Sequence, residues 1–173
     1  MGIQHLDVSK GGYSRVTFSK NLAFFTGHAA PQYQTLKEQA EGILKRYDEL
    51  FKQFGLKKSN ILYTTCFMKN ADDEDEFADI YFQWIDPKNP PAGVTVTALP
   101  IQHSPVGDNI LMELSFIVAT NDSLPIKRYD VTRGCRMVEY DGMAYFTGHV
   151  YPKVDTLGEQ VAGVLNRYAE LFE

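Results

Sequence analysis

Hydrophobic positions along the chain follow two patterns, short unbroken runs typical of strands and a spacing of three to four typical of helices. From residue 36 to Phe54, apolar side chains recur at helical spacing, which predicts an amphipathic helix. Thr35 and Glu38 form a capping box at its start, and Gly55 ends it. A second helix is expected to end near Trp84. Runs rich in β-branched and aromatic residues predict strands at 15–18, 22–26, 60–68, 94–99 and 110–119.

The chain contains an internal repeat. Residues 15–51 recur at 136–172 without a gap, and the tetrapeptide Phe-Thr-Gly-His stands at 25–28 and again at 146–149. Each copy has two short apolar stretches joined by a turn, then a capping box and a helical stripe. Because this order is typical of a hairpin followed by a helix, we expect the same small unit twice.

The repeat predicts two parts of unequal size. Residues 1–120 form a main domain of fold class α+β, in the order β-β-α-β-α-β-β, with helices on one face of a mixed sheet. Residues 128–173 form the partial repeat, which is too small to bury its own apolar face. We expect this tail to dock on the main domain of its own or a neighbouring subunit, to extend the sheet and to add a third helix.

Composition narrows the class of protein. The 173 residues are 44% hydrophobic and 23% charged, as in packed globular domains, and the net charge of −5 argues against nucleic acid as a partner. No apolar run is long enough to cross a membrane. Two cysteines are expected to be reduced thiols, which indicates a cytoplasmic protein. The histidines and cysteines lack metal-ligand spacing, and no phosphate loop is found, so we expect neither a metal nor a cofactor.

A few polar residues have both a functional and a structural interpretation. Glu113 lies in an apolar strand, so it is either a general acid or base with a raised pKa or an ordinary strand glutamate. The acidic run at 72–76 fits a helix N-terminus better than a cation site. His28 and His149 are retained in both copies, which favours a structural role at a strand end over catalysis.

Several motifs in the main domain, taken in order, resemble the YjgF/YER057c/UK114 family, also called the Rid family (reactive intermediate deaminases). The resemblance covers about residues 11–119. The motifs that carry it are Gly12-Tyr13-Ser14, Asn21-Leu22 followed by Phe24-Phe25-Thr26-Gly27, Tyr63-Thr64-Thr65-Cys66-Phe67-Met68, Leu99-Pro100 and Met112-Glu113-Leu114.

This resemblance implies a chorismate-mutase-like fold and a homo-oligomer, a trimer above all, with small-molecule ligands bound in clefts between subunits. It implies hydrolysis of small enamines or imines, with Glu113 handling the attacking water. Tyr13, Tyr81, Ala92 and Gly93 are the matching substrate-binding positions.

The chain departs from the family pattern at the substrate loop. Where the family has an arginine that grips a carboxylate, this loop has Gly93 or Pro91, depending on where a short deletion falls. No arginine lies between Arg46 and Arg128, although the tail brings Arg128, Arg133 and Arg136, one of which could supply the missing charge. Three functions therefore stay open: a deaminase for a small nitrogenous metabolite, a non-catalytic metabolite-binding protein and, less favoured, an endoribonuclease.

Overall fold

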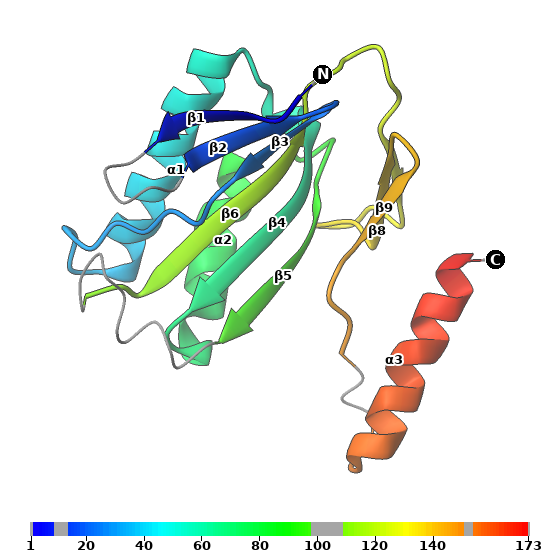
Figure 1. The fold of residues 1–173 in the computed structure, drawn as a ribbon. Helices are drawn as coiled ribbons and strands as arrows, with labels where there is room; N and C mark the ends of the chain where they lie inside the picture. Colours follow the sequence, from blue (N-terminus) through cyan, green and yellow to red (C-terminus); the bar gives the residue numbers. More distant parts are fainter. Residues whose placement is uncertain (1, 9–13, 98–108, 151–153, 173) are drawn as a thin grey trace.

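The structure is a computed structural model that describes residues 2–8, 14–97, 109–150 and 154–172. Among these residues, six strands form one mixed sheet in the order β1-β2-β3-β6-β4-β5. The strands are β1 (Gln4–Val8), β2 (Ser14–Ser19), β3 (Leu22–Phe25), β4 (Ile61–Met68), β5 (Ala92–Thr97) and β6 (Met112–Ala119). Two helices, α1 (Leu36–Phe54) and α2 (Glu74–Trp84), lie together on one face of this sheet, which we call the helix face (Figure 1). The α+β expectation is confirmed.

The sheet is antiparallel except at one edge. β4 and β5 run parallel, joined by a crossover that contains α2, while β6 lies antiparallel between β3 and β4. Short 3₁₀ turns at Lys58–Asn60 and Ala71–Asp73 precede β4 and α2. β1 was not predicted, because its sequence Gln-His-Leu-Asp-Val has no apolar run and forms an edge strand beside β2.

The ends of α1 follow the sequence signals. The Oγ1 of Thr35 accepts the N–H of Glu38 (3.3 Å), and the Glu38 carboxylate accepts the N–H of Thr35 (3.2 Å). Gly55 takes a left-handed conformation with φ of 66° and donates to the carbonyl of Lys52. This helix buries Tyr47 and its apolar neighbours against β3, β4 and β6.

The tail has its own strands and helix. β7 (Lys127–Tyr129), β8 (Met137–Tyr140) and β9 (Met143–Phe146) form a separate three-stranded sheet, followed by α3 (Leu157–Phe172). Within one chain the tail therefore does not extend the main sheet, contrary to our expectation, and extension of a neighbouring subunit's sheet stays a prediction. Apolar side chains of its hairpin instead pack against the main domain. Pairing at the sheet edge would leave the apolar face of the hairpin and that of the main sheet exposed to water. The cluster formed there comprises Leu62, Ala92, Ala119, Cys135, Val138 and Tyr140.

The face that the tail covers is the one opposite the helices, which we call the open face. Met112, Leu114 and Phe116 point into the core with α1, so the alternate residues of β6 point to the open face. Ile117 and Tyr63, paired across β6 and β4, border the tail's cluster there. The tail thus covers one end of the open face. No described helix is long and apolar enough to cross a membrane.

The two copies of the repeat fold alike. The hydroxyl of Tyr47 donates to the carbonyl of Thr26 (3.1 Å), and that of Tyr168 donates to Thr147 (3.3 Å). The same correspondence holds for the amide side chains at the helix starts: Gln39 donates to the carbonyl of Tyr33 (2.9 Å) and Gln160 to that of Val154 (3.1 Å). The internal repeat is therefore a repeat of structure as well as of sequence.

Candidate functional site

Glu113 lies at the end of the open face that the tail leaves uncovered. It pairs with Phe67 across β4, and its carboxylate is packed against Gly27 of the first Phe-Thr-Gly-His segment. A Cβ added at Gly27 would overlap that carboxylate, so a glycine is needed for this approach. Within the described part of the chain, no ion pair or hydrogen bond holds the Glu113 carboxylate. Among the described residues the Glu113 side chain is half-buried.

Backbone pairing behind the carboxylate holds Gly27 in place. The N–H of His28 donates to the carbonyl of Leu114 (2.9 Å), and the N–H of Leu114 donates back to His28 (3.1 Å). The hydroxyl of buried Tyr47 bonds to the Leu114 carbonyl (2.6 Å), and its ring stacks on that of His28 at 4.7 Å. His28 therefore lies at a strand end, as its structural interpretation predicts.

Burial changes the acidity of this site. Desolvation raises the pKa of the half-buried Glu113 carboxyl above its ordinary value of 4.5. Burial also raises the pKa of Tyr47 well above 10, with a smaller contribution from the charge of Glu113. A carboxyl with a raised pKa is a better proton acceptor, which suits general acid–base chemistry.

The predicted substrate-binding residues Ala92 and Gly93 lie at the opposite end of the sheet. Ala92 pairs with Tyr63 on β4, whereas Glu113 pairs with Phe67, four residues further along that strand. At about 3.3 Å per residue the separation along β4 is about 13 Å. One chain therefore does not bring Glu113 and Gly93 together, and a site containing both needs two copies. The trimer with inter-subunit clefts stays a prediction.

The tail occupies the Gly93 end through its copy of the Phe-Thr-Gly-His segment. The N–H of Gly148 donates to the carbonyl of Gly93 (3.0 Å), and the N–H of Gly93 donates to Oγ1 of Thr147 (3.2 Å). A Cβ on Gly148 would lie 2.8 Å from a methyl of Val94, so this glycine also permits a close approach. Ala92 is fully buried in this arrangement.

A groove of about 1100 Å³ runs between the tail and the edge formed by β5 and α2. Tyr81 lines it but is nearly buried, and its hydroxyl is hydrogen-bonded to that of Thr64 (2.7 Å). Arg136 and His149 line the tail's side of the groove. Burial and the charge of Arg136 lower the pKa of His149. Glu113 is not among the lining residues.

The three arginines of the tail have different surroundings. The guanidinium of Arg128 donates to the carbonyls of Ser59 (2.7 Å), Pro90 (2.9 Å) and Ile61 (3.2 Å), so it joins the tail to the main domain. Arg133 pairs with Asp79 of α2 at 2.9 Å on the surface. Of the three, only Arg136 borders the groove beside Gly93.

The remaining predicted features are the two cysteines, the metal-ligand pattern and Tyr13. Both cysteines are buried, which raises the pKa of Cys66 to about 12 and that of Cys135 to about 11 and leaves the thiols protonated. The described residues contain no cluster of potential metal ligands. Tyr13 lies outside the described residues. Gly27 was not predicted as a site residue, although its retention in both copies of the repeat was the available signal.

Comparison with known proteins gives a consistent family. Residues 4–119 match the model of the family described as endoribonuclease L-PSP. A RutC family protein from Haemophilus influenzae is 33% identical over 88 residues, which cover 49% of this chain and 75% of that protein. The tail lies beyond the end of the family match.

Solved structures agree with the fold. A YjgF family member from Neisseria meningitidis has a TM-score of 0.62 and 20% identity, over 70% of this chain and 98% of its own. A Rid family protein from Yersinia pestis has a TM-score of 0.60 and 22% identity, over 68% of this chain and 99% of its own. At these identities the likeness supports the shared architecture.

Proposed function

The chain belongs to the endoribonuclease L-PSP family, which includes the YjgF and Rid proteins, and we propose that it hydrolyses a small imine, enamine or related nitrogenous metabolite with Glu113 as its acid–base group. The observation that carries this proposal is the half-buried Glu113 carboxyl, packed against Gly27 with a raised pKa. Its position on the open face leaves it accessible to a small molecule.

The proposed chemistry uses one carboxyl in both steps. As a carboxylate, Glu113 takes a proton from water while the water oxygen adds to the carbon of the protonated C=N bond, which gives a neutral carbinolamine. The protonated carboxyl then donates to nitrogen, and as the C–N bond breaks the resulting carboxylate takes the proton of the carbinolamine hydroxyl. A ketone or aldehyde and ammonia leave, and the carboxyl returns its proton to solvent. A pKa raised towards neutrality helps both steps, because the group must hold and release a proton near the working pH.

The substrate need not carry a carboxylate, because this chain lacks the arginine with which the family binds one. Gly93 or Pro91 stands there. A Cβ added at Gly93 would lie 2.9 Å from the backbone oxygen of Thr64, so an arginine side chain does not fit at Gly93 without backbone movement. We therefore expect poor turnover of 2-iminopropionate, which relies on such a contact. A rate equal to that of arginine-bearing relatives would contradict this expectation.

A second candidate, non-catalytic binding of a small metabolite, is favoured by one observation. Both backbone polar groups of Gly93 are bonded to the tail, so the family's substrate loop is capped in this chain. Under this alternative a ligand binds at the Glu113 end without being consumed. The endoribonuclease alternative is set aside because the net charge of −5 argues against a nucleic-acid substrate.

A measurement of ammonia release distinguishes a deaminase from a non-catalytic metabolite-binding protein. The purified chain is mixed with imines generated in place from a panel of amino acids, and ammonia is measured over time. Deaminase function predicts release above the buffer rate, with Glu113→Gln about 10²–10⁴-fold slower. The control is Glu76→Gln, the same change at an exposed position of α2, which should keep full activity. Binding without ammonia release, or an active Glu113→Gln, would refute the catalytic proposal.

A further inference from the structure

Glu113 shares the open face with two apolar side chains. β6, β4 and β5 are neighbours in the sheet, and their register places Glu113 opposite Phe67 and Phe67 opposite Val96. Cys66 and Met68, on either side of Phe67, are buried in the core, so Phe67 points to the open face, as Glu113 does. We call Glu113, Phe67 and Val96 the Glu113 row.

The Glu113 row keeps apolar surface in contact with solvent. Phe67 is half-buried, and Val96 is 38% exposed. Val96 lies four residues from Ala92, which packs against the tail on the open face, so strand alternation places Val96 on that face as well. With strands about 4.8 Å apart, the row spans about 10 Å, which matches a molecule with a polar group at Glu113 and a phenyl-sized group on Phe67.

The charge of the row is negative. A cation close to Glu113 would lower the pKa of its carboxyl, whereas burial raises that pKa and no described cation offsets the effect. Two described cations, Lys69 just beyond β4 and Arg15 on β2, occupy neighbouring positions in the sheet, and neither charge lowers this pKa. The row therefore complements a positively charged group and repels a carboxylate.

We propose that the Glu113 row binds a protonated imine that carries an aromatic or branched apolar group and no carboxylate. The positive C=N group lies against the Glu113 carboxylate, and the apolar group lies on Phe67 and Val96. An imine made from an amino acid would instead place its own carboxylate beside that of Glu113. This inference rests on the proposed function, and it adds Phe67 as the residue that selects the substrate.

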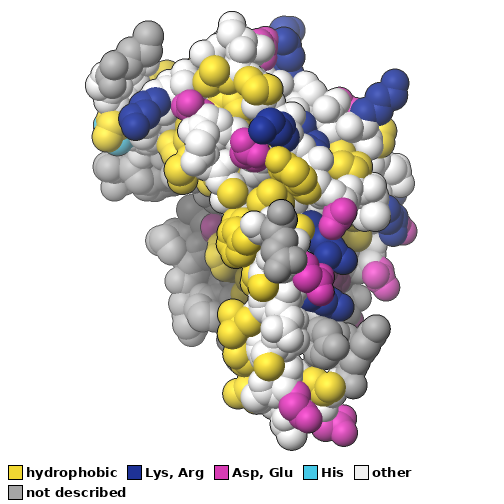
Figure 2. Space-filling view, turned by 90° about the vertical axis from the view of Figure 1, so that its right-hand side faces the viewer, with side chains coloured by type: hydrophobic (Ala, Val, Ile, Leu, Met, Phe, Trp, Pro, Cys, Tyr) yellow, Lys and Arg dark blue, Asp and Glu magenta, His cyan; other side chains and the backbone are white. Residues whose placement is uncertain are grey.

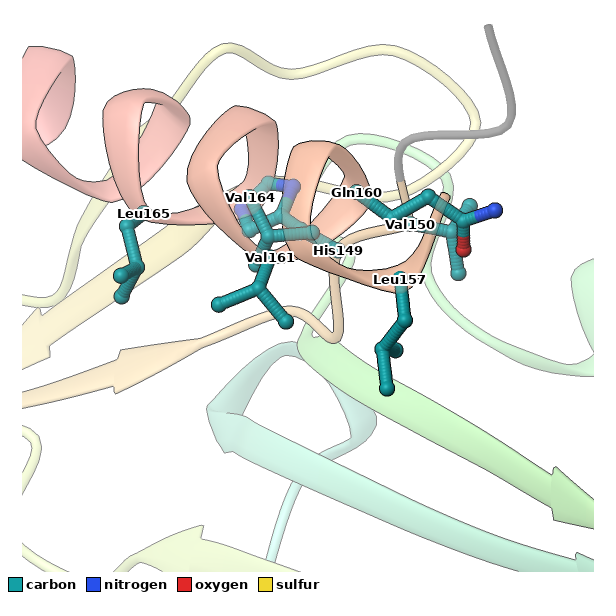
Figure 3. A pocket seen from close by; sticks show the side chains of 7 residues that line it. All are labelled: His149, Val150, Leu157, Gln160, Val161, Val164 and Leu165. Atoms are coloured by element: carbon teal, nitrogen blue, oxygen red, sulfur yellow. The ribbon is translucent and has the colours of Figure 1, made fainter. Parts of the chain in front are cut away.

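The hollow beside α3 fits such a ligand less well. Figure 2 shows hydrophobic side chains along one side of this helix, and Figure 3 shows Leu157, Val161 and Leu165 projecting from it. The hollow of about 270 Å³ has His149 and Gln160 as its polar residues, and no carboxylate is among its described lining residues. A positively charged ligand has no counter-charge there.

The groove of about 1100 Å³ is the alternative location for an aromatic cation. Its lining includes the carboxylates of Glu74 and Asp130 and the ring of Phe82. Asp130 is already paired with Arg136 at 3.6 Å, which offsets its charge. The ring of Phe82 distinguishes this groove from the Glu113 row in the test below.

The binding test uses the full chain and benzamidine, a stable cation with the ring and the charged C–N group of protonated benzaldimine. Isothermal titration calorimetry at neutral pH measures its affinity. We expect benzamidine to bind at least tenfold more tightly than acetamidine, which has the same charge but no ring. Phenylglyoxylate, which has the ring and a carboxylate, should not bind measurably at the same concentrations.

Two positions locate the bound ring. Phe67→Ala should weaken benzamidine binding about tenfold, to the level of acetamidine, because the ring loses its aromatic partner. Phe67→Leu should keep part of the affinity. Phe82→Ala removes another half-buried ring, in the groove, and should leave the affinity unchanged. Affinity lost in Phe82→Ala instead of Phe67→Ala, or binding of phenylglyoxylate that Lys69→Gln removes, would overturn the proposal.

A rate test compares a matched pair of imines. Benzaldimine is generated from benzylamine by a flavin-dependent amine oxidase with oxygen as the oxidant, and its carboxylated counterpart from phenylglycine by an amino-acid oxidase. We expect the chain to accelerate ammonia release from benzaldimine at least tenfold more than from the counterpart, and Phe67→Ala to remove this preference. A preference for the carboxylated imine would contradict the proposal.

Together the tests distinguish this inference from the proposed function. If benzamidine binds through Phe67 and no imine releases ammonia, the ligand class is supported and catalysis is refuted. If carboxylated imines are hydrolysed through Glu113 and benzamidine does not bind, catalysis is supported and the ligand class is wrong.

Discussion

Gly27 and Glu113 form a pair in which a missing side chain makes room for a carboxylate. The glycine is held by the pairing of His28 with Leu114, so its position depends on strand contacts and not on its own conformation. The carboxylate can rotate away, because it is the end of a flexible side chain. The pair can therefore be perturbed with little damage to the fold.

The Gly27→Ala variant tests this geometry. The added methyl should displace the Glu113 carboxylate and lower activity by at least tenfold, with a stability loss of about 1 kcal/mol or less. Gly158→Ala is the control, since a Cβ there meets nothing within 4 Å. Steady-state rates and urea unfolding are the measurements. Full activity of Gly27→Ala would show that the carboxylate position does not matter.

The raised pKa of Glu113 predicts a pH-dependent cost in stability. Its carboxyl binds a proton more readily in the folded state than in the unfolded state, so the stability linked to it is present below pH 4.5 and is lost as pH rises through the folded pKa. Glu113→Gln should therefore stabilise the protein modestly at neutral pH, because the group is partly exposed and solvent screens it, and have little effect at acid pH. Thermal unfolding across pH checks this. A variant that destabilises at neutral pH would contradict it.

At the scale of elements, α1 and α3 are one helix in two environments. α1 begins with a capping box at Thr35, and at the start of α3 the N–H of Glu159 donates to Oγ1 of Thr156 (3.3 Å). α1 lies in the core, whereas none of the described residues of α3 is buried. Helical stability in proteins comes mostly from packing, so α3 depends more on its own local interactions.

Removing the two caps should have different consequences. Thr35→Ala should lower the free energy of global unfolding by about 1 kcal/mol, because α1 unfolds with the core. Thr156→Ala should instead speed hydrogen exchange in α3 and barely change global unfolding, because that helix can open separately. Urea titration and hydrogen exchange distinguish them. An equal loss of global stability in both variants would mean that α3 is part of the cooperative unit.

At the scale of the whole molecule, the tail and the main domain are joined by a small apolar cluster and by Arg128. The guanidinium of Arg128 is partly buried and donates to carbonyls of the β4 and β5 ends, while Val138 and Tyr140 cover Ala92. We propose on this basis that the main domain, residues 1–120, unfolds together with the hairpin of the tail, the first part of residues 128–173. α3 lies outside this joint core.

Arg128→Ala tests that junction. It should cost about 1–3 kcal/mol, because buried carbonyls lose their donor. Arg133→Ala removes an exposed pair with Asp79 from the same tail and should change stability by less than about 1 kcal/mol. Chemical unfolding of both variants is the measurement. Equal effects would mean that Arg128 does not hold the tail on the main domain.

Local patterns in the sequence determined most of the elements and their ends. The helical stripe of α1, the capping box at Thr35 and the glycine cap at Gly55 depend on neighbours within a few residues, and all are confirmed. The repeat and the family motifs likewise predicted the fold class and the hairpin–helix unit of the tail. β1 was missed because an edge strand needs no apolar run.

Only the tertiary structure decided how the distant parts meet. Because β6 runs antiparallel to β4 while β5 runs parallel to it, Glu113 and Gly93 lie at opposite ends of the sheet, although 20 positions of chain separate them. The same holds for the tail, whose strands form a separate sheet on the open face while Thr147 and Gly148 bond to Gly93 in the edge strand β5. Strand order and docking depend on contacts between residues far apart in sequence, and short-range periodicity carries no information about them.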